Sequence, residues 1–337
     1  MALRGRKVAI VGTGLVGSST AFSLITQGVC EEILMIDLNE ERAWGEVMDL
    51  NHCIEYLNRN TKVRVGRYDE CGDVDIVVIT AGAPPKPGQT RIDTLHLSAK
   101  IAESIVNPIM ESGFKGYFII ISNPVDMIAY HVYKLSGLPK SHIIGTGTSV
   151  DSARLKNFIG ELLNVDPRCV QAYSMGEHGD SQMVPWSHVY VGGKPFLKVI
   201  EDNQERVGDV NLNTLVLDTA KAGWEVYNRK GTTYYGIATA TVAIIRAIIN
   251  DENRIMPVST LLDGEYGEFN VFTGVPVVLN GSGVKEVVEI DMLPEELVKF
   301  KESNDFIRQC ISELGYEIIK EKEYKTNKHV FLKLIGE

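Results

Sequence analysis

The fold of this chain is decided by one stretch near its start, Lys7-Val8-Ala9-Ile10-Val11-Gly12-Thr13-Gly14-Leu15-Val16-Gly17. Its first five residues form an apolar run typical of a buried strand, and a helical apolar pattern then extends to Gln27. We expect the three glycines to allow a tight turn, the approach of a pyrophosphate to the backbone, and close packing of helix on strand, in that order. Because the N-terminus of such a helix attracts phosphate, the stretch predicts a dinucleotide-binding turn.

A second strand supports this interpretation. The run Glu32-Ile33-Leu34-Met35-Ile36 ends at Asp37, twenty residues after Gly17. A carboxylate at that place can accept hydrogen bonds from the adenosine ribose hydroxyls, whereas a 2′-phosphate would meet its negative charge. We therefore expect NAD rather than NADP as the cofactor, and the sequence assigns no metal.

Composition argues against several classes of partner. The chain has 337 residues, with 34 Lys and Arg against 44 Asp and Glu and a net charge of −10, and it lacks any basic run. This balance excludes nucleic acid and an anionic membrane surface as natural partners. No apolar stretch is long enough for a bilayer, the first strand begins too early for a secretory signal, and five scattered cysteines indicate reduced thiols. We expect a cytoplasmic protein.

Strands and helices alternate through the first half of the chain. Buried-strand runs occupy residues 74–80 and 117–122, and helical patterns occupy residues 93–111 and 125–135. This alternation predicts an α/β protein with a Rossmann-type, doubly wound parallel sheet.

From about residue 150 the pattern becomes mixed, which predicts an α+β region with a final helix from Pro294. Helical patterns cover residues 151–163, 211–228 and 236–250, and strand patterns cover residues 169–175, 184–191, 255–262, 275–279 and 284–290.

Two short runs combine a base, a carboxylate and a guanidinium. They are Asp151-Ser152-Ala153-Arg154 and Gly176-Glu177-His178-Gly179-Asp180. A histidine held by a carboxylate can exchange a proton with an alcohol or a carbonyl, and an arginine can bind a substrate carboxylate through two parallel hydrogen bonds. Beside a dinucleotide site, these groups indicate 2-hydroxy acid dehydrogenase chemistry.

Five motifs together resemble the lactate and malate dehydrogenase family. They occur in the family's order and spacing, and the resemblance covers roughly residues 5–316. The motifs are Gly12 to Gly17, Thr80-Ala81-Gly82, Ser122-Asn123-Pro124-Val125-Asp126, Asp151 to Arg154 and Gly176 to Asp180. The resemblance implies an NAD-binding Rossmann domain over residues 1–148, a catalytic domain over 149–318 and an extension of unknown role over 319–337. It also implies a cytoplasmic homo-oligomer, a tetramer, in carbohydrate metabolism such as glycolysis.

The resemblance implies a role for each matching residue. His178 is similar to the acid/base that protonates the substrate oxygen, Asp151 to the partner that stabilises its imidazolium form, and Arg154 to the residue that binds the substrate carboxylate. Arg91, at the end of a Pro/Gly-rich loop, is similar to an arginine that closes over the site and polarises the reacting carbonyl.

Further positions match residues around the substrate and the cofactor. Asn123 resembles a residue that hydrogen-bonds the reacting oxygen, and Thr233 resembles a substrate-contacting hydroxyl. The positions that the resemblance assigns to cofactor binding are Gly12, Gly14, Leu15, Val16, Gly17, Asp37, Thr80, Ala81, Gly82, Ile121 and Asn123.

Substrate choice depends on two departures from the family. Malate dehydrogenases carry an arginine in the mobile loop, and lactate dehydrogenases usually carry a glutamine, where this chain has Pro85. Proline offers neither charge nor donor, so a second substrate carboxylate loses its counter-ion. Gly223 replaces a common alanine, and we expect extra room beside the substrate side chain. Pyruvate and L-lactate fit best as substrates. Two other substrates remain alternatives, a bulkier aliphatic acid such as 2-hydroxyisocaproate and malate, and so does a different class of protein, a non-catalytic NAD-sensing module.

Two more departures concern regulation. Allosteric bacterial lactate dehydrogenases bind fructose 1,6-bisphosphate between subunits through an arginine and a histidine, at positions that here hold Lys156 and Tyr173. Lysine lacks the bidentate fork of arginine, and tyrosine adds no positive charge. We expect activity that is insensitive to this sugar phosphate.

Overall fold

The parallel sheet is built from short apolar strands in the first half of the chain. The computed structural model describes residues 6–82 and 91–317, and for residues 91–93 it describes the backbone alone. Six strands are mutually parallel, in the order β6-β5-β4-β1-β2-β3. They are β1 (Lys7–Val11), β2 (Glu32–Ile36), β3 (Lys62–Val65), β4 (Ile76–Ile79), β5 (Tyr117–Ile120) and β6 (Ile143–Gly145). The order reverses between β1 and β4, the place where such sheets bind nucleotides.

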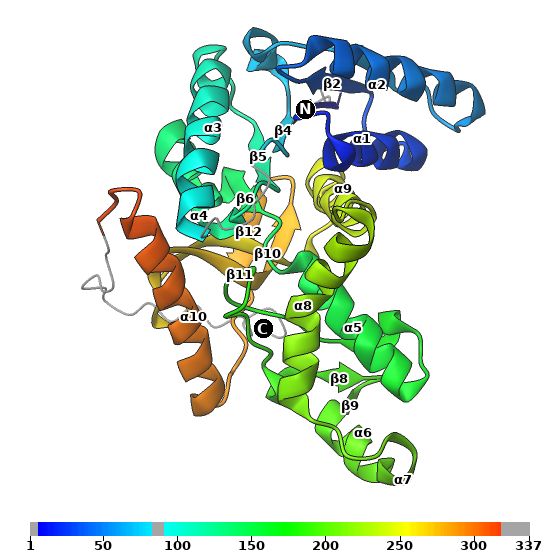
Figure 1. Cartoon of the computed structure of the whole chain (residues 1–337), viewed down its shortest axis with the longest axis vertical. Coiled ribbons are helices and arrows are strands. Elements are labelled where there is room, and N and C mark those ends of the chain that lie inside the picture. The colour runs from blue at the N-terminus through cyan, green and yellow to red at the C-terminus, as the bar shows by residue number, and fades with distance from the viewer. Residues whose placement is uncertain (1–5, 83–90, 318–337) are drawn as a thin grey trace, which may run out of the picture.

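Helices cover both faces of this sheet. They are α1 (Leu15–Gln27), α2 (Glu40–Cys53), α3 (Arg91–Glu111) and α4 (Val125–Ser136). In Figure 1, α1 and α2 lie on one side of the strands and α3 and α4 on the other. This is the doubly wound arrangement that the alternation of strands and helices predicted.

Three antiparallel strands extend the sheet beyond β6. They are β10 (Arg254–Asp263), β11 (Phe269–Asn280) and β12 (Gly283–Val287), and they complete a nine-stranded sheet within the described residues. The junction is the pairing of Ser259 with Gly145. The two halves of the chain therefore share one sheet.

The remaining elements form the mixed region that the sequence predicted. The long helices are α5 (Ser149–Leu163), α8 (Leu212–Lys230), α9 (Tyr235–Ile249) and α10 (Pro294–Ser312). A small sheet and two short helices lie at the end of the molecule farthest from α2 (Figure 1). They are β7 (Val170–Gln171), β8 (Tyr190–Val191), β9 (Lys194–Pro195), α6 (Phe196–Asp202) and α7 (Gln204–Val207). The 3-10 turns are η1 (Ile54–Tyr56), η2 (Tyr68–Asp73), η3 (Lys140–His142), η4 (Pro167–Cys169), η5 (Trp186–His188) and η6 (Glu265–Gly267).

Two predicted strands are much shorter than the sequence pattern suggested. The runs at 169–175 and 184–191 keep only two residues each in β7 and β8. The chain leaves the small sheet because Met175 bridges to Met183 and Gly176 bridges to Gly274 of β11. These contacts direct the segment that contains His178 toward the large sheet.

No helix in the described part of the chain is long and apolar enough to cross a membrane.

Candidate active site

The glycine-rich turn has the geometry of a phosphate-binding loop. Gly12 has a φ of +98°, and a Cβ atom there would lie 2.7 Å from Thr80 Oγ1 and 2.8 Å from Ala81 N. A Cβ atom on Gly17 would lie 1.9 Å from the Gly12 carbonyl oxygen, so the first turn of α1 packs directly on the loop. That turn has no side-chain cap and no acidic residue. Its N–H groups are therefore left for an anionic ligand.

Asp37 lies at the carboxyl end of β2, next to this turn. Its Oδ2 accepts hydrogen bonds from Thr13 N at 2.6 Å and Thr13 Oγ1 at 2.9 Å, and its Oδ1 accepts one from Asn39 N at 2.9 Å. Burial raises the pKa of Asp37, but these donors lower it further than burial raises it, and the net pKa lies below its usual value. The carboxylate is therefore ionised at neutral pH and keeps lone pairs for hydroxyl groups.

The other predicted cofactor positions follow the ends of β4 and β5. Thr80 Oγ1 donates to the Gly12 carbonyl at 2.8 Å, and Ser122 Oγ donates to the Ala81 carbonyl at 2.6 Å. Asn123 is exposed, is followed by a cis peptide bond to Pro124, and has its carbonyl held by Ser98 Oγ of α3 at 2.9 Å. The remaining positions lie along the same edge of the sheet: Leu15 and Val16 in the first turn of α1, Gly82 after β4 and Ile121 after β5.

A buried carboxylate joins the predicted base to the predicted arginine. Asp151, which is 1% exposed, accepts a hydrogen bond from His178 Nδ1 on Oδ2 at 2.6 Å and one from Arg154 Nη1 on Oδ1 at 2.8 Å. Asp151 and Arg154 lie three residues apart on α5, which places both on one face of the helix. The side chains of His178 and Arg154 are 28% and 17% exposed, so both can still be reached from solvent.

The electrostatics of this group favour a charged imidazole. Burial lowers the pKa of His178, but the carboxylates of Asp151 and Asp126 together raise it by more, and the net pKa lies above its usual value. Burial raises the pKa of Asp151, but His178 and Arg154 lower it to a net value below the usual range. Asp151 thus stays ionised, and its charge favours the protonated form of His178.

Two side chains without a predicted role hold the loop that contains His178. The His178 N–H donates to Asp126 Oδ2 on α4 at 2.7 Å, and the neighbouring Glu177 N–H donates to Ser303 Oγ on α10 at 2.8 Å. Asp126 ends one of the motifs quoted above, and that motif was a signal for it. Nothing in the local sequence of Ser303 singled it out.

Gly223 contacts the arginine rather than an open pocket. A Cβ atom at Gly223 of α8 would lie 3.2 Å from Arg154 Nη2 and 3.4 Å from Nη1. The guanidinium of Arg154 thus lies beside Gly223. The prediction of extra room beside the substrate side chain stays a prediction. The glycine lets α5 and α8 approach closely enough for Arg154 to lie against the backbone of α8.

The remaining predicted substrate residues are only partly described. Thr233 lies between α8 and α9 and is partly exposed. Arg91 begins α3, and its side chain, like all of Pro85, lies outside the described residues. The structure thus brings together His178, Asp151 and Arg154, and it leaves the predicted contacts of Arg91 and Pro85 untested.

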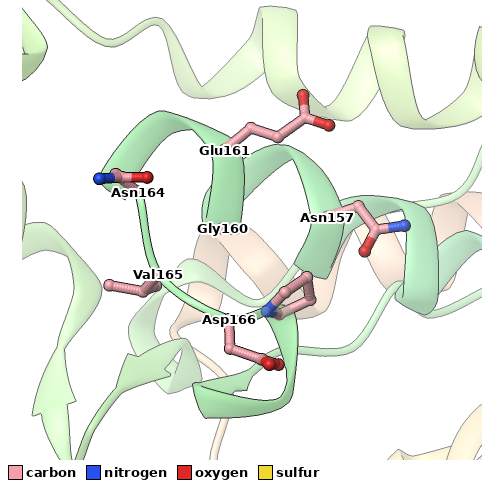
Figure 2. Close-up of a pocket in the computed structure, with 7 residues that line it drawn as sticks. Asn157, Gly160, Glu161, Asn164, Val165 and Asp166 are labelled. Atoms are coloured by element: carbon pink, nitrogen blue, oxygen red, sulfur yellow. The ribbon is translucent and has the colours of Figure 1, made fainter.

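A separate surface pocket of about 330 Å³ lies where α5 ends and η4 begins. Figure 2 shows Glu161 and Asp166 beside the amides of Asn157 and Asn164 around it. This lining has no basic residue, so the pocket is poorly suited to a phosphate or a substrate carboxylate. Within residues 6–82 and 91–317, no group of three or more His, Cys, Asp or Glu side chains is placed to hold a metal ion.

Comparison with known proteins gives the same picture over nearly the whole chain. Residues 6–145 match the NAD binding domain of lactate/malate dehydrogenases, and residues 148–318 match their alpha/beta C-terminal domain. A protein named L-lactate dehydrogenase 3 from Bacillus thuringiensis subsp. konkukian (strain 97-27) is 57% identical over 92% of this chain and 98% of its own length. An L-lactate dehydrogenase from Lactococcus lactis subsp. cremoris (strain NZ9000) is 44% identical over 93% of this chain and 100% of its own length.

A solved structure agrees in fold. The minor L-lactate dehydrogenase from Enterococcus mundtii in its ligands-bound form is 43% identical, superposes with a TM-score of 0.89, and covers 93% of this chain and 99% of that one. The predicted Rossmann-type fold and the predicted cofactor NAD are confirmed by these matches. The chain belongs to the lactate/malate dehydrogenase family of NAD-dependent oxidoreductases.

Proposed function

We propose that this protein is an L-lactate dehydrogenase, which interconverts pyruvate and L-lactate with NADH and NAD⁺. The observation that carries the proposal is the His178–Asp151–Arg154 group, in which one buried carboxylate holds both a proton-exchanging imidazole and a guanidinium. The L-lactate dehydrogenase relatives at 57% and 44% identity support the choice of substrate within the family.

The edge of the sheet near β1 fits the cofactor. The uncapped first turn of α1 offers N–H groups to the pyrophosphate, and the ionised Asp37 can accept hydrogen bonds from the ribose hydroxyls. Bound NADH supplies the hydride for the carbonyl carbon of the 2-oxo acid.

His178 moves the proton. In pyruvate reduction its protonated ring gives a proton from Nε2 to the carbonyl oxygen, while the Nδ1–H stays bonded to Asp151 at 2.6 Å. The oxygen becomes the hydroxyl of lactate, and the ring is left neutral. In lactate oxidation the neutral ring takes the proton back from the hydroxyl. The imidazolium form occurs in both directions, and the charge on Asp151 stabilises it in each.

Arg154 binds the substrate carboxylate in this proposal. Its Nη1 is held by Asp151, which leaves Nη2 and Nε as donors for the two oxygens of the carboxylate. From their motifs, we assign Arg91 to polarisation of the reacting carbonyl, Asn123 to a hydrogen bond with the same oxygen, and Thr233 to a substrate contact. Pro85 supplies no cation for a second carboxylate, which favours a monocarboxylic acid.

The surface supports a homo-oligomer, which we propose to be a tetramer. A groove of about 430 Å³ runs between α1, α2 and α9 and is lined by Phe22 and Tyr235. These side chains are 50% and 68% exposed, and Trp44 and Met48 of α2 are also more than half exposed. Exposed apolar patches of this kind mark association surfaces, and a second copy of the chain is the proposed occupant. Sedimentation of the purified protein as a monomer would exclude it.

Two further assignments belong to the same proposal. We divide the chain into an NAD-binding domain over residues 1–148, a catalytic domain over 149–318 and an extension over 319–337, in line with the matched segments 6–145 and 148–318. We place the protein in the cytoplasm, as an enzyme of carbohydrate metabolism.

One assay tests the proposed function. Purified protein is mixed with NADH and with pyruvate, 2-oxoisocaproate or oxaloacetate, and the loss of nicotinamide absorbance is followed. Pyruvate should give the highest kcat/KM. A higher value for 2-oxoisocaproate or oxaloacetate would reassign the substrate, and no reduction of any 2-oxo acid would refute the proposal.

A further inference from the structure

The loop before Gly179 is held through two consecutive main-chain N–H groups. The acceptor for Glu177 is the neutral hydroxyl of Ser303, at 2.8 Å, and the acceptor for His178 is the carboxyl of Asp126, at 2.7 Å. The two bonds have similar lengths but differ in charge. Placing a carboxyl group there requires a reason, because a hydroxyl or an amide could accept the same bond.

The carboxyl of Asp126 is completely enclosed. Its side chain is 1% exposed, in the first turn of α4, and Oδ2 accepts the His178 N–H. The Ser259 hydroxyl on β10 is nearby, but neither Ser259 Oγ nor Asp126 Oδ1 completes a hydrogen bond among the described residues. Burial raises the pKa of Asp126, while Ser259 and the His178 N–H lower it, with a net value above the usual range. Burying a carboxyl group is costly, and such groups are retained where they have a function more often than by chance.

We propose that Asp126 is a positioning residue for proton transfer, which fixes the His178 main chain and places a second negative charge beside its imidazole. This inference rests on the proposed role of His178 as the acid/base. Three ionisable groups act on that ring: Asp151 and Arg154 from α5, and Asp126 from α4, whose ionised form raises the pKa of His178. Asp126 adds to the effect of Asp151 without occupying either ring nitrogen, so Nε2 stays free for the substrate.

The position of Asp126 also couples two parts of the site. It follows Asn123, the residue proposed to bond the substrate oxygen, by three positions, and its bond to His178 joins segments 52 residues apart. The proton donor and the oxygen-binding residue are thereby tied to the same turn at the start of α4. Movement of α4 would move both relative to the cofactor edge, and the bond limits that movement.

The test compares Asp126→Asn with Ser303→Ala in the full-length enzyme. Asparagine keeps an acceptor for the His178 N–H and can donate to Ser259, but it removes the charge. In Asp126→Asn, the kcat/KM for pyruvate should begin to fall at a pH about half a unit or more below the wild-type midpoint. Above the wild-type midpoint, kcat/KM of this variant should therefore be at least about threefold lower than that of wild type. The Kd for NADH should be unchanged. Ser303→Ala removes the neighbouring bond without changing charge and should leave the midpoint in place, whatever its effect on kcat.

A titration independent of turnover accompanies these assays. The His178 ring, followed by NMR in histidine-labelled holoenzyme, should titrate at lower pH in Asp126→Asn than in wild type. Ser259→Ala removes a hydroxyl that favours the ionised form of Asp126. It should shift the His178 titration in the same direction by a smaller amount, and this variant replaces Asp126→Asn if the latter does not fold.

Two results would overturn the inference. One is an unchanged His178 titration in Asp126→Asn, or in Ser259→Ala if the first variant does not fold. The other is an equal shift in Ser303→Ala, which would mean that loop displacement and not charge is responsible. Failure of the proposed function looks different, because wild-type protein would then reduce no 2-oxo acid while the NMR comparison could still be made.

Discussion

Asp37 and Asp151 are both carboxylates with a pKa below the usual value, yet they reach it in different ways. Asp37 is partly exposed and is stabilised chiefly by neutral donors from Thr13 and Asn39, with a smaller contribution from the cation of Arg42. Asp151 is enclosed and is stabilised by the cations of His178 and Arg154. The negative charge of Asp37 is therefore only weakly balanced, by Arg42, at the cofactor edge, whereas that of Asp151 is balanced within the site by His178 and Arg154.

This difference assigns the two carboxylates to two functions, which are discrimination between cofactors and catalysis. A weakly balanced negative charge repels a 2′-phosphate, so Asp37 suits the choice between NAD and NADP. A charge that is matched by a titrating group sets the pKa of that group, so Asp151 suits proton transfer by His178. Substitutions at the two positions should therefore change different measured quantities, and the largest change is expected on the catalytic side.

Replacing the titrating partner of Asp151 tests the catalytic half of the comparison. His178→Asn should lower kcat by roughly 10²- to 10⁴-fold, because the proton donor is lost, and should leave NADH binding nearly intact. Stopped-flow single turnovers and NADH fluorescence titration measure the two effects. Near-normal turnover would remove His178 from the mechanism.

A matched control for that substitution exists on α4. His131 also lies beside a carboxylate, with Nε2 3.3 Å from Glu103 and Nδ1 2.7 Å from Tyr316 Oη. Glu103 is 49% exposed, and burial lowers the pKa of His131 below its usual value. Because an exposed carboxylate does not hold this ring in its charged form, His131→Asn should change kcat by less than about threefold, within the range of an indirect effect.

Removing the charge of Asp37 tests the cofactor-discriminating half of the comparison. Wild-type enzyme should prefer NADH to NADPH by about 30-fold in kcat/KM or more, which corresponds to roughly 2 kcal/mol of repulsion after screening. Asp37→Ser should reduce that preference while kcat with saturating NADH changes little. Equal efficiency with both cofactors in the wild type would refute the role of Asp37.

A third carboxylate, on the substrate, extends the comparison. Oxaloacetate brings a second negative group to a loop position that holds Pro85 and therefore no cation. We expect pyruvate to be preferred, and Pro85→Arg to raise kcat/KM for oxaloacetate by about tenfold through a new ion pair. Pro85→Gln is the matched control, since it adds a donor without charge, and an equal gain from it would show that charge is not the cause.

The smallest effect is expected for an anion outside the site. Lys156 lies over the ring of Tyr173, with Nζ 5.7 Å from its centroid, and burial lowers the pKa of the lysine. A lysine held on a ring in this way has no arginine fork to offer to a bisphosphate. Fructose 1,6-bisphosphate at millimolar concentration and constant ionic strength should leave the KM for pyruvate unchanged. A several-fold drop in that KM would contradict this prediction.

The parts of the site that are local in sequence could be predicted. The turn from Gly12 to Gly17 and the carboxylate of Asp37 belong to one strand–helix–strand unit, and Asp151 and Arg154 share a face of α5 because they are three residues apart. The doubly wound parallel sheet also followed from the alternation of strands and helices.

Contacts between distant segments could not be predicted in the same way. The bonds from Asp126 and Ser303 to the His178 loop span 52 and 126 residues, and they depend on how α4 and α10 pack against the sheet. The contact of Gly223 with Arg154 depends likewise on the approach of α8 to α5. Side-chain pattern records which face of an element is apolar, but it does not record which element covers that face.

The central claim, that His178 exchanges the proton while Asp151 holds its charged form, is tested most directly by the pH dependence of the two reaction directions. Pyruvate reduction needs the protonated ring, so its kcat/KM should fall as pH rises through the raised pKa of His178. Lactate oxidation needs the neutral ring, so its kcat/KM should rise through the same midpoint, and Asp151→Asn should move both curves to lower pH. Parallel curves in the two directions, or midpoints unmoved in Asp151→Asn, would contradict the account.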